Sequence, residues 1–366
     1  MDVNLATAAQ GAQVYPWQQE IWQSLTSRLA QGKLAHAYLL AGESGIGKTD
    51  FARAFAHYLL CHERTATAAC GRCKACLLAA AGNHPDLFIA QAEEGSAVIK
   101  IEQIRLLGRF VQQTSHFATC RVIILSPAEA LGPASANALL KVLEEPPAET
   151  WFLVLSHQPG LLMPTVKSRC QLQPMPHPTE QQGYSWLQSL GQQSSEADLK
   201  VALAITKNRP LAARVALQQN LPGERRDLLV GLAQLLKAQL LPIELAKRVE
   251  KSDRTGILML MQNSLVSLIR YQASADPQYL HEYLHEYLHD VELRELAKLG
   301  HINPSAGSHQ SKILHRLYID INDAIMQLKS SSNPNPLLIL ENCFIEWQRV
   351  LSTDPQSENQ CLSLTR

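Results

Sequence analysis

The chain has 366 residues, enough for two or three domains, and its 46% apolar content supports real hydrophobic cores. Its formal net charge is zero, which excludes a protein drawn to nucleic acid by an overall basic field. No stretch approaches the roughly 18 uninterrupted apolar residues that span a bilayer. The N-terminal residues carry no signal-peptide pattern, so we expect a cytoplasmic chain without membrane contact, whose eight cysteines are thiols or metal ligands.

Residues 42–49 match G-x-x-x-x-G-K-[ST], the pattern of a phosphate-binding loop. The apolar run 35–41 predicts a buried strand before the loop, and the spacing over 50–61 predicts a helix after it. We expect glycine-rich backbone N–H groups to face an anion, a lysine to reach the β- and γ-phosphates, and a threonine hydroxyl to hold Mg²⁺. The candidate nucleotide-binding residues are Gly42, Gly45, Gly47, Lys48 and Thr49. This pattern predicts an α/β nucleotide-binding domain, with ATP or ADP and Mg²⁺ as possible ligands. The lead-in segment 15–17 and a helix over 18–30 are placed to lie beside the base.

Four cysteines follow the first helix of that domain. Cys61, Cys70, Cys73 and Cys76 are separated by eight, two and two residues, and charged residues stand between the last three. Four thiolates suit tetrahedral Zn²⁺ and leave no open position for chemistry. We therefore expect a structural zinc module over about 61–84. Free reduced cysteines are the alternative, and the remaining four cysteines are expected to be inert.

The next elements predicted along the chain are strands over 87–90 and 121–125, separated by a helix over 99–110. ATPases of this class carry acidic residues at the end of the second of these strands, to order Mg²⁺ and to align water. Here those positions are Ser126 and Pro127, and Glu129 comes too late, in the following loop. The sequence therefore predicts little or no hydrolysis, unless the strand end is misplaced by two residues.

A helix is predicted over 132–145 and a strand over 150–156, where Ser156 or His157 is placed to sense a γ-phosphate. Two prolines in 171–177 indicate a domain boundary. Beyond it the pattern is helical. We expect a nucleotide-binding domain over 1–175, a small helical lid over 176–220, an all-helical domain over 221–351 and a polar tail over 352–366.

The segment 281–289 contains H-E-x-x-H twice, the pattern of a zinc protease helix. In that alternative His281 and His285 bind Zn²⁺ and Glu282 is the base. Both matches come from one tandem duplication of Tyr-Leu-His-Glu, and nothing local supplies a third ligand. A helix with one packed face and one wet face is the simpler interpretation.

Several motifs together resemble the bacterial clamp-loader AAA+ subunits over most of residues 15–220. They are the phosphate loop, the cysteine spacing, His84-Pro85-Asp86, the run 137–147 and Ser168-Arg169-Cys170. Residues 333–338 resemble the end of the helical collar in that family. The gamma/tau motors of the family have Asp-Glu after the central strand, and the delta-prime subunits lack it. This chain lacks it too, and 15–17 and 148–152 also look like delta-prime subunits.

The resemblance implies an α/β P-loop AAA+ domain with an inserted zinc module, a helical lid and a C-terminal all-α collar for oligomerisation. It also implies that the chain joins gamma/tau and delta subunits in a hetero-pentamer. This pentamer is part of the DNA polymerase III holoenzyme, which is a DNA-directed DNA polymerase and so a nucleotidyltransferase. That pentamer uses ATP to load the sliding clamp on primed DNA during replication.

The resemblance also assigns Arg169 as an arginine finger supplied in trans to a neighbouring ATP. A helix-end salt bridge is the alternative role for this residue. Lys48 and Thr49 are intact, although delta-prime subunits often have a degraded loop. The family's lid arginine falls near Leu211, and Arg209 and Arg214 are close to that position but offset from it. We expect absent or weak ATPase activity, and an active gamma/tau-type ATPase that uses Glu129 is the alternative.

Overall fold

The computed structural model describes residues 12–92, 98–117, 120–191, 194–250, 252–274, 291–300, 302, 308–329 and 335–352. The H-E-x-x-H repeat at 281–289 and the tail beyond 352 lie outside these residues. The chain divides into two compact units. Met1–Ser185 with Arg209–Ala212 form the first unit, and Trp186–Asn208 with Ala213–Arg366 form the second. The finer division into lid and collar stays a prediction.

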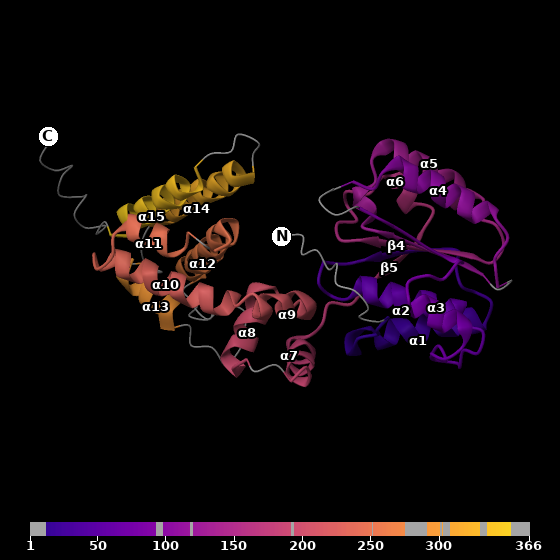
Figure 1. Cartoon of the computed structure of the whole chain (residues 1–366). Helices are drawn as coiled ribbons and strands as arrows, with labels where there is room; N and C mark the ends of the chain where they lie inside the picture. Colours follow the sequence, from indigo (N-terminus) through magenta and orange to yellow (C-terminus); the bar gives the residue numbers. More distant parts are fainter. Residues whose placement is uncertain are drawn as a thin grey trace, which may run out of the picture. The chain divides into compact units, whose positions relative to one another are not determined.

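A five-stranded, entirely parallel sheet is the centre of the first unit, with strand order β2-β3-β4-β1-β5 (Figure 1). The strands are β1 (Ala37–Ala41), β2 (Leu87–Gln91), β3 (Arg121–Ser126), β4 (Thr150–Ser156) and β5 (Gln171–Pro174). In the register of the pairs, Ala37 lies opposite Phe152 of β4, and Tyr38 lies opposite Gln171 of β5. The predicted α/β class is confirmed for this unit.

Alternate residues of the strands supply two hydrophobic cores on opposite faces of the sheet. Tyr38 and Leu40 pack with Phe51 on one face, while Leu39 packs with Leu139 on the other. Figure 1 shows α1, α2 and α3 along one face and α4, α5 and α6 along the other. These elements, with two short 3-10 helices, are η1 (Pro16–Gln18), α1 (Gln19–Ala30), α2 (Lys48–Leu60), α3 (Lys74–Ala80), α4 (Ile101–Gln112), η2 (Ala128–Ala130), α5 (Pro133–Glu144) and α6 (Pro164–Lys167).

Helix α3 and strand β5 of the first unit were not predicted from the sequence. Helix α3 lies inside the cysteine segment, and β5 occupies part of the stretch that was expected to be a domain boundary. Strand β5 pairs along one side only, with β1, and Gln171 and Leu172 are exposed. An edge strand needs no apolar run and tolerates proline. The polar sequence of β5, which ends in proline, therefore gave no strand signal.

The second unit is helical throughout its described residues. Its helices are α8 (Glu196–Ile205), α10 (Leu221–Leu236), α11 (Pro242–Arg248), α12 (Arg254–Ser274), α13 (Val291–Leu299), α14 (Ser308–Lys329) and α15 (Pro336–Ser352), while α7 (Glu180–Ser189) and α9 (Pro210–Gln218) run across the boundary between the units. Leu232, Met261 and Trp347 are fully buried in its core. Helix α10 has Pro222 in its first turn, where a proline is tolerated because it needs no N–H partner there. None of the helices in the described parts of the chain is long and apolar enough to cross a membrane.

Candidate functional site

The candidate phosphate loop connects the end of β1 to the start of α2. Because β1 and β4 are parallel, their carboxyl ends meet at one edge of the sheet, where ligands of open α/β sheets bind. The backbone N–H of Gly42 donates to the carbonyl of Ser156 at 3.2 Å and so ties the loop to the end of β4. Lys48 and Thr49 are the first two residues of α2. The structure therefore brings the five predicted nucleotide-binding residues into one loop and helix start.

Two glycines of the loop adopt left-handed backbone conformations. Gly45 has φ +85° and Gly47 has φ +87°. A Cβ atom on Gly47 would lie 2.4 Å from the ring of Tyr15, and one on Gly45 would lie 2.9 Å from the Cβ of Ala212. Glycine is therefore required at both positions by the backbone angle and by the available space.

The short helix η1 holds the outer side of the loop. The indole Nε1 of Trp17 donates to the carbonyl of Ile46 at 2.9 Å, and the Nε2 of Gln18 donates to the carbonyls of Ile46 at 3.0 Å and Gly47 at 3.1 Å. In a trans peptide the N–H points opposite to the C=O. The N–H groups that follow these two carbonyls therefore point away from η1, as phosphate binding requires. The predicted role of this segment beside the base stays a prediction.

Lys48 is buried, with 3% of its surface exposed. Its Nζ donates to the carbonyls of Gly42 and Glu43, both at 2.6 Å. Burial lowers the pKa of Lys48 from 10.5 to about 8 and Arg209 adds to the decrease, while the carboxylates of Glu129 and Glu43 oppose it. A desolvated cation favours an anionic ligand, because a phosphate would supply the charge that neutral carbonyls lack.

The predicted loss of the acidic pair holds in the structure. Strand β3 ends at Ser126, one residue later than predicted, and Pro127 follows it, so neither residue at the strand end is a carboxylate. Glu129 lies in η2 rather than in an irregular loop. Its Oε1 accepts hydrogen bonds from the backbone N–H groups of His157 at 2.8 Å and Gln158 at 3.2 Å. Its Oε2 and the Oγ of Ser156 are buried and have no hydrogen-bond partner among the residues that the structure describes.

Arg209 contacts the loop, although its position in the sequence is offset from that expected for the lid arginine. Its Nη1 lies 3.4 Å from the carbonyl of Ser44, and its Nε lies 3.7 Å from the Oε2 of Glu43. The backbone N–H of Leu211 donates to the carbonyl of Gly45 at 3.2 Å. A segment 165 residues along the chain from Ser44 thus reaches the loop. No local pattern could have revealed this approach.

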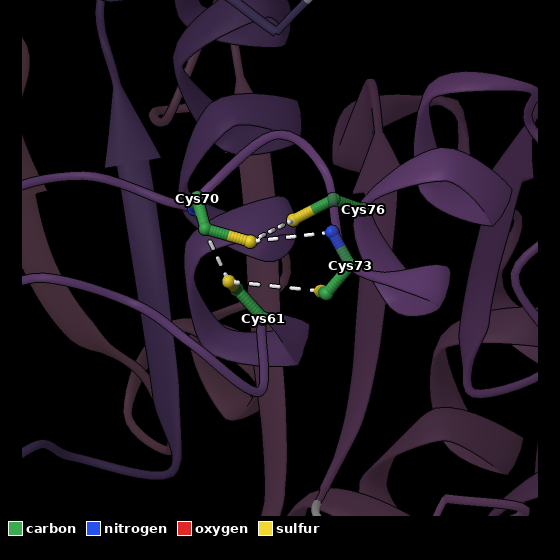
Figure 2. Close-up of side chains that lie close together, drawn as sticks. All are labelled: Cys61, Cys70, Cys73 and Cys76. Carbon is green, nitrogen blue, oxygen red and sulfur yellow. Dashed lines mark hydrogen bonds between the residues drawn. The ribbon is translucent and has the colours of Figure 1, made fainter.

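The four cysteines of the predicted zinc module converge (Figure 2). Their sulfur atoms all lie within 4.8 Å of one another, with Cys61 to Cys73 at 4.0 Å and Cys70 to Cys76 at 3.9 Å. Tetrahedral zinc with Zn–S bonds of about 2.3 Å requires sulfur atoms about 3.8 Å apart. The arrangement fits that geometry. Cys61 caps the end of α2 and Cys76 lies in the first turn of α3, so the unpredicted helix orients one of the four thiols.

Hydrogen bonds within the cluster favour the thiolate form of Cys73, whereas burial raises the pKa of Cys61 and Cys76. The backbone N–H of Cys70 donates to the Sγ of Cys61, and that of Cys73 to the Sγ of Cys70, each at 3.3 Å. Burial raises the pKa of Cys73, but backbone N–H groups of Cys76 and His62 and the neighbouring thiols outweigh it and bring that pKa to about 6. Thiolate is the form that binds metal.

Arg169 follows α6, in the first unit. Its Nη1 donates to the carbonyl of Thr165 at 2.9 Å, and its Nη2 bonds to the carboxylate of Glu144 at the end of α5. The ion pair that the sequence offered as the alternative role is therefore present. The side chain of Arg169 is 32% exposed, so the guanidinium remains accessible from outside the unit. Among the described residues, its hydrogen bonds do not include the loop 42–47.

Comparison with known proteins identifies the family. A family model described as "DNA polymerase III, delta subunit" matches residues 17–179, and one described as "DNA polymerase III, delta subunit, C terminal" matches 219–349. The DNA polymerase III subunit delta' of Pseudomonas aeruginosa is 36% identical over 341 residues, which cover 92% of this chain and 98% of that protein. The chain belongs to the delta-prime family of DNA polymerase III subunits.

Two further relatives fit this membership. The delta' subunit of Escherichia coli (strain K12) is 33% identical over 219 residues, 60% of this chain and 65% of that protein. The DNA polymerase III subunit tau/gamma of Haemophilus influenzae is 37% identical over 153 residues, 42% of this chain and 22% of that protein. The resemblance drawn from the motifs is thus confirmed at the level of the delta-prime family.

The crowding at Gly47 predicts the outcome of a substitution. Gly47→Ala should lower the free energy of unfolding by about 2–4 kcal/mol, since the left-handed conformation and the contact with Tyr15 both penalise a Cβ. Gly32→Ala is the matched control, because Gly32 also has positive φ, +65°, but nothing lies within 4 Å of its Cβ position. It should cost about 1 kcal/mol. Urea denaturation of the full chain measures both, and equal losses would show that η1 does not pack on the loop.

The lowered pKa of Lys48 predicts a pH dependence of stability. Between pH 8 and 10.5 the folded chain loses this proton while the unfolded chain keeps it, so the free energy of unfolding should rise with pH across that window. The rise attributable to Lys48 is at most about 3 kcal/mol. Lys48→Met should remove this part of the rise. Denaturation curves recorded at several pH values test it, and parallel profiles for the two proteins would contradict it.

Proposed function

We propose that this chain is a clamp-loader subunit of the delta-prime kind, which joins gamma/tau and delta subunits in a hetero-pentamer. That complex uses ATP to open the sliding clamp and to place it on primed DNA, and the chain meets both only through the complex. Family membership supports this function. The observation that carries it is the accessible Arg169 in a chain that has Ser126 and Pro127 where a motor has carboxylates.

The proposed contribution of Arg169 is an arginine finger for the ATP of a neighbouring subunit. A guanidinium is always charged and its fork matches phosphate oxygens, so it can stabilise the charge that develops on a transferring phosphoryl group. The anchoring of α6 supports this role. Val166 of α6 is buried in the hydrophobic core between the sheet and the helices on this face. An arginine next to a rigid element keeps a fixed orientation, and correct orientation supplies most of the catalysis available in phosphoryl transfer.

The chain's own loop is proposed to bind ATP or ADP with Mg²⁺ and to hydrolyse it weakly or not at all. The loop supplies N–H groups, the buried cation of Lys48 and the hydroxyl of Thr49. The end of β3 supplies no carboxylate to order Mg²⁺ or to align water. Phosphoryl transfer is catalysed almost entirely by positioning and charge stabilisation, so loss of the carboxylates should abolish ATP hydrolysis while ATP binding remains.

An active ATPase of the gamma/tau type is the second candidate. The position of Glu129 favours it, because one carboxylate oxygen is held by two backbone N–H groups and the other is buried without a partner among the described residues. Arg209 on the loop favours it too. Against it, the bonds of Glu129 tie η2 to the turn after β4, which is a structural role in itself. We favour the first candidate for this reason.

The cysteine cluster is proposed to hold one structural Zn²⁺. Its spacing, its sulfur separations and the N–H···S bonds support this assignment. Four thiolates close the coordination shell, so the metal would connect the end of α2 with the start of α3 and take no part in chemistry. The proposal extends to a helical lid over 176–220, an oligomerising collar over 221–351 and a cytoplasmic location.

The zinc assignment predicts the metal content of the protein. The purified chain should carry about one zinc per molecule, and Cys73→Ser should lose most of it together with thermal stability, since three ligands bind structural zinc much more weakly. Cys170→Ser is the matched control, because Cys170 lies outside the cluster, and it should retain the metal. Elemental analysis measures both. A parent protein without zinc, or a variant that keeps it, would refute the assignment.

The finger role predicts the effect of Arg169→Ala on the assembled complex. ATP turnover at the site that Arg169 serves should fall on the order of 10³-fold or more, and turnover of the whole complex should fall by the share of that site. Lys167→Ala is the matched control, since it removes an exposed positive charge two residues before Arg169, at the end of α6. Steady-state phosphate release measures turnover, after gel filtration has shown that both variants assemble. Unchanged turnover with Arg169→Ala would refute the role.

A further inference from the structure

The guanidinium of Arg169 is held by a carboxylate on the neighbouring helix. Glu144, the last residue of α5, accepts a hydrogen bond from Nη2, and its side chain is 47% exposed. On the other side, Nη1 donates to the carbonyl of Thr165 and lies 3.4 Å from the Oγ of Ser168. The fork of Arg169 is therefore fixed at both ends by its own unit.

Helix α5, which carries Glu144, and helix α6, which Arg169 follows, are anchored in one core. Leu139 and Leu143 of α5 and Val166 of α6 are all at most 1% exposed and belong to the same hydrophobic cluster. Packing of these apolar side chains sets the positions of the two backbones. The pair itself contributes little to stability, because an exposed ion pair is screened by solvent. Its consequence is the orientation of the guanidinium.

The hydrogen-bond count leaves a donor for a phosphate. Each terminal nitrogen of a guanidinium carries two hydrogens. Both hydrogens of Nη1 have partners, the carbonyl of Thr165 and the Oγ of Ser168, whereas Nη2 bonds to Glu144 alone among the described residues and keeps one hydrogen for an incoming ligand. The side chain of an arginine has about 2 kcal/mol of rotamer entropy to lose when it is ordered. A side chain that is already ordered loses less of it on engaging a ligand, which is the general advantage of preorganisation.

We propose that Glu144 is a positioning residue for the finger: its carboxylate holds Arg169 in the orientation that meets the neighbour's phosphates. This inference rests on the proposed function of Arg169. In this role Glu144 acts through the guanidinium of Arg169 and not on the nucleotide. Its removal should therefore change the rate of the chemical step rather than the binding of ATP.

The test is Glu144→Gln in the assembled complex. The amide keeps the shape and loses the charge, so kcat for ATP should fall about two- to fivefold, the worth of an exposed ion pair, with KM unchanged. Glu145→Gln is the matched control, since it removes the same charge one residue away, and Glu145 is exposed and forms no ion pair among the described residues. It should leave kcat unchanged.

A double-variant cycle separates positioning from a structural role. If Glu144 acts through the finger, Glu144→Gln should have no further effect on turnover in the Arg169→Ala background. The same fold loss in both backgrounds, or unchanged or faster turnover by Glu144→Gln alone, would overturn the inference and leave the finger role intact. Unchanged turnover by Arg169→Ala would instead refute the finger role and the inference with it.

Discussion

Parallel pairing of β1 with β4 is the constraint on which the candidate nucleotide site depends. It sets Ala41 opposite Ser156, so the chain must turn into the loop at the edge where β4 also ends. The bond from Gly42 to Ser156 continues that register by one residue. The other features of the loop accompany this tight turn. They are two left-handed glycines, two carbonyls that accept hydrogen bonds from η1, and the ammonium of Lys48 buried against the loop's own carbonyls.

The same sheet accounts for the separation of binding from catalysis in the proposed function. The end of β3 reaches the same edge as the loop, yet it presents Ser126 and Pro127 instead of carboxylates. In the proposed function the chain therefore binds phosphates at the loop and lacks the carboxylates that would drive hydrolysis there. Arg169, the proposed finger, follows α6 and forms hydrogen bonds to residues of α5 and α6.

Local patterns predicted the parts of the fold and site that are local in origin. The loop motif and the cysteine spacing led directly to residues that converge, and β4 has the bounds expected from its apolar run, Thr150–Ser156. The features that were missed depend on contacts distant in sequence. Arg209 reaches the loop from 165 residues away, and Glu129 is turned toward β4 by backbone donors. Strand β5 was missed because an edge position imposes no apolar pattern.

The central claim is that this chain gives catalysis to a neighbour and performs little of its own. Mg²⁺-ATP turnover by the purified chain alone, beside its Lys48→Ala variant, tests this claim most directly. Turnover at the background rate for both proteins is the predicted result, because no carboxylate at the end of β3 orders Mg²⁺ or aligns water. Turnover by the parent that Lys48→Ala abolishes would contradict the account. Glu129 would then be the acid of an active motor.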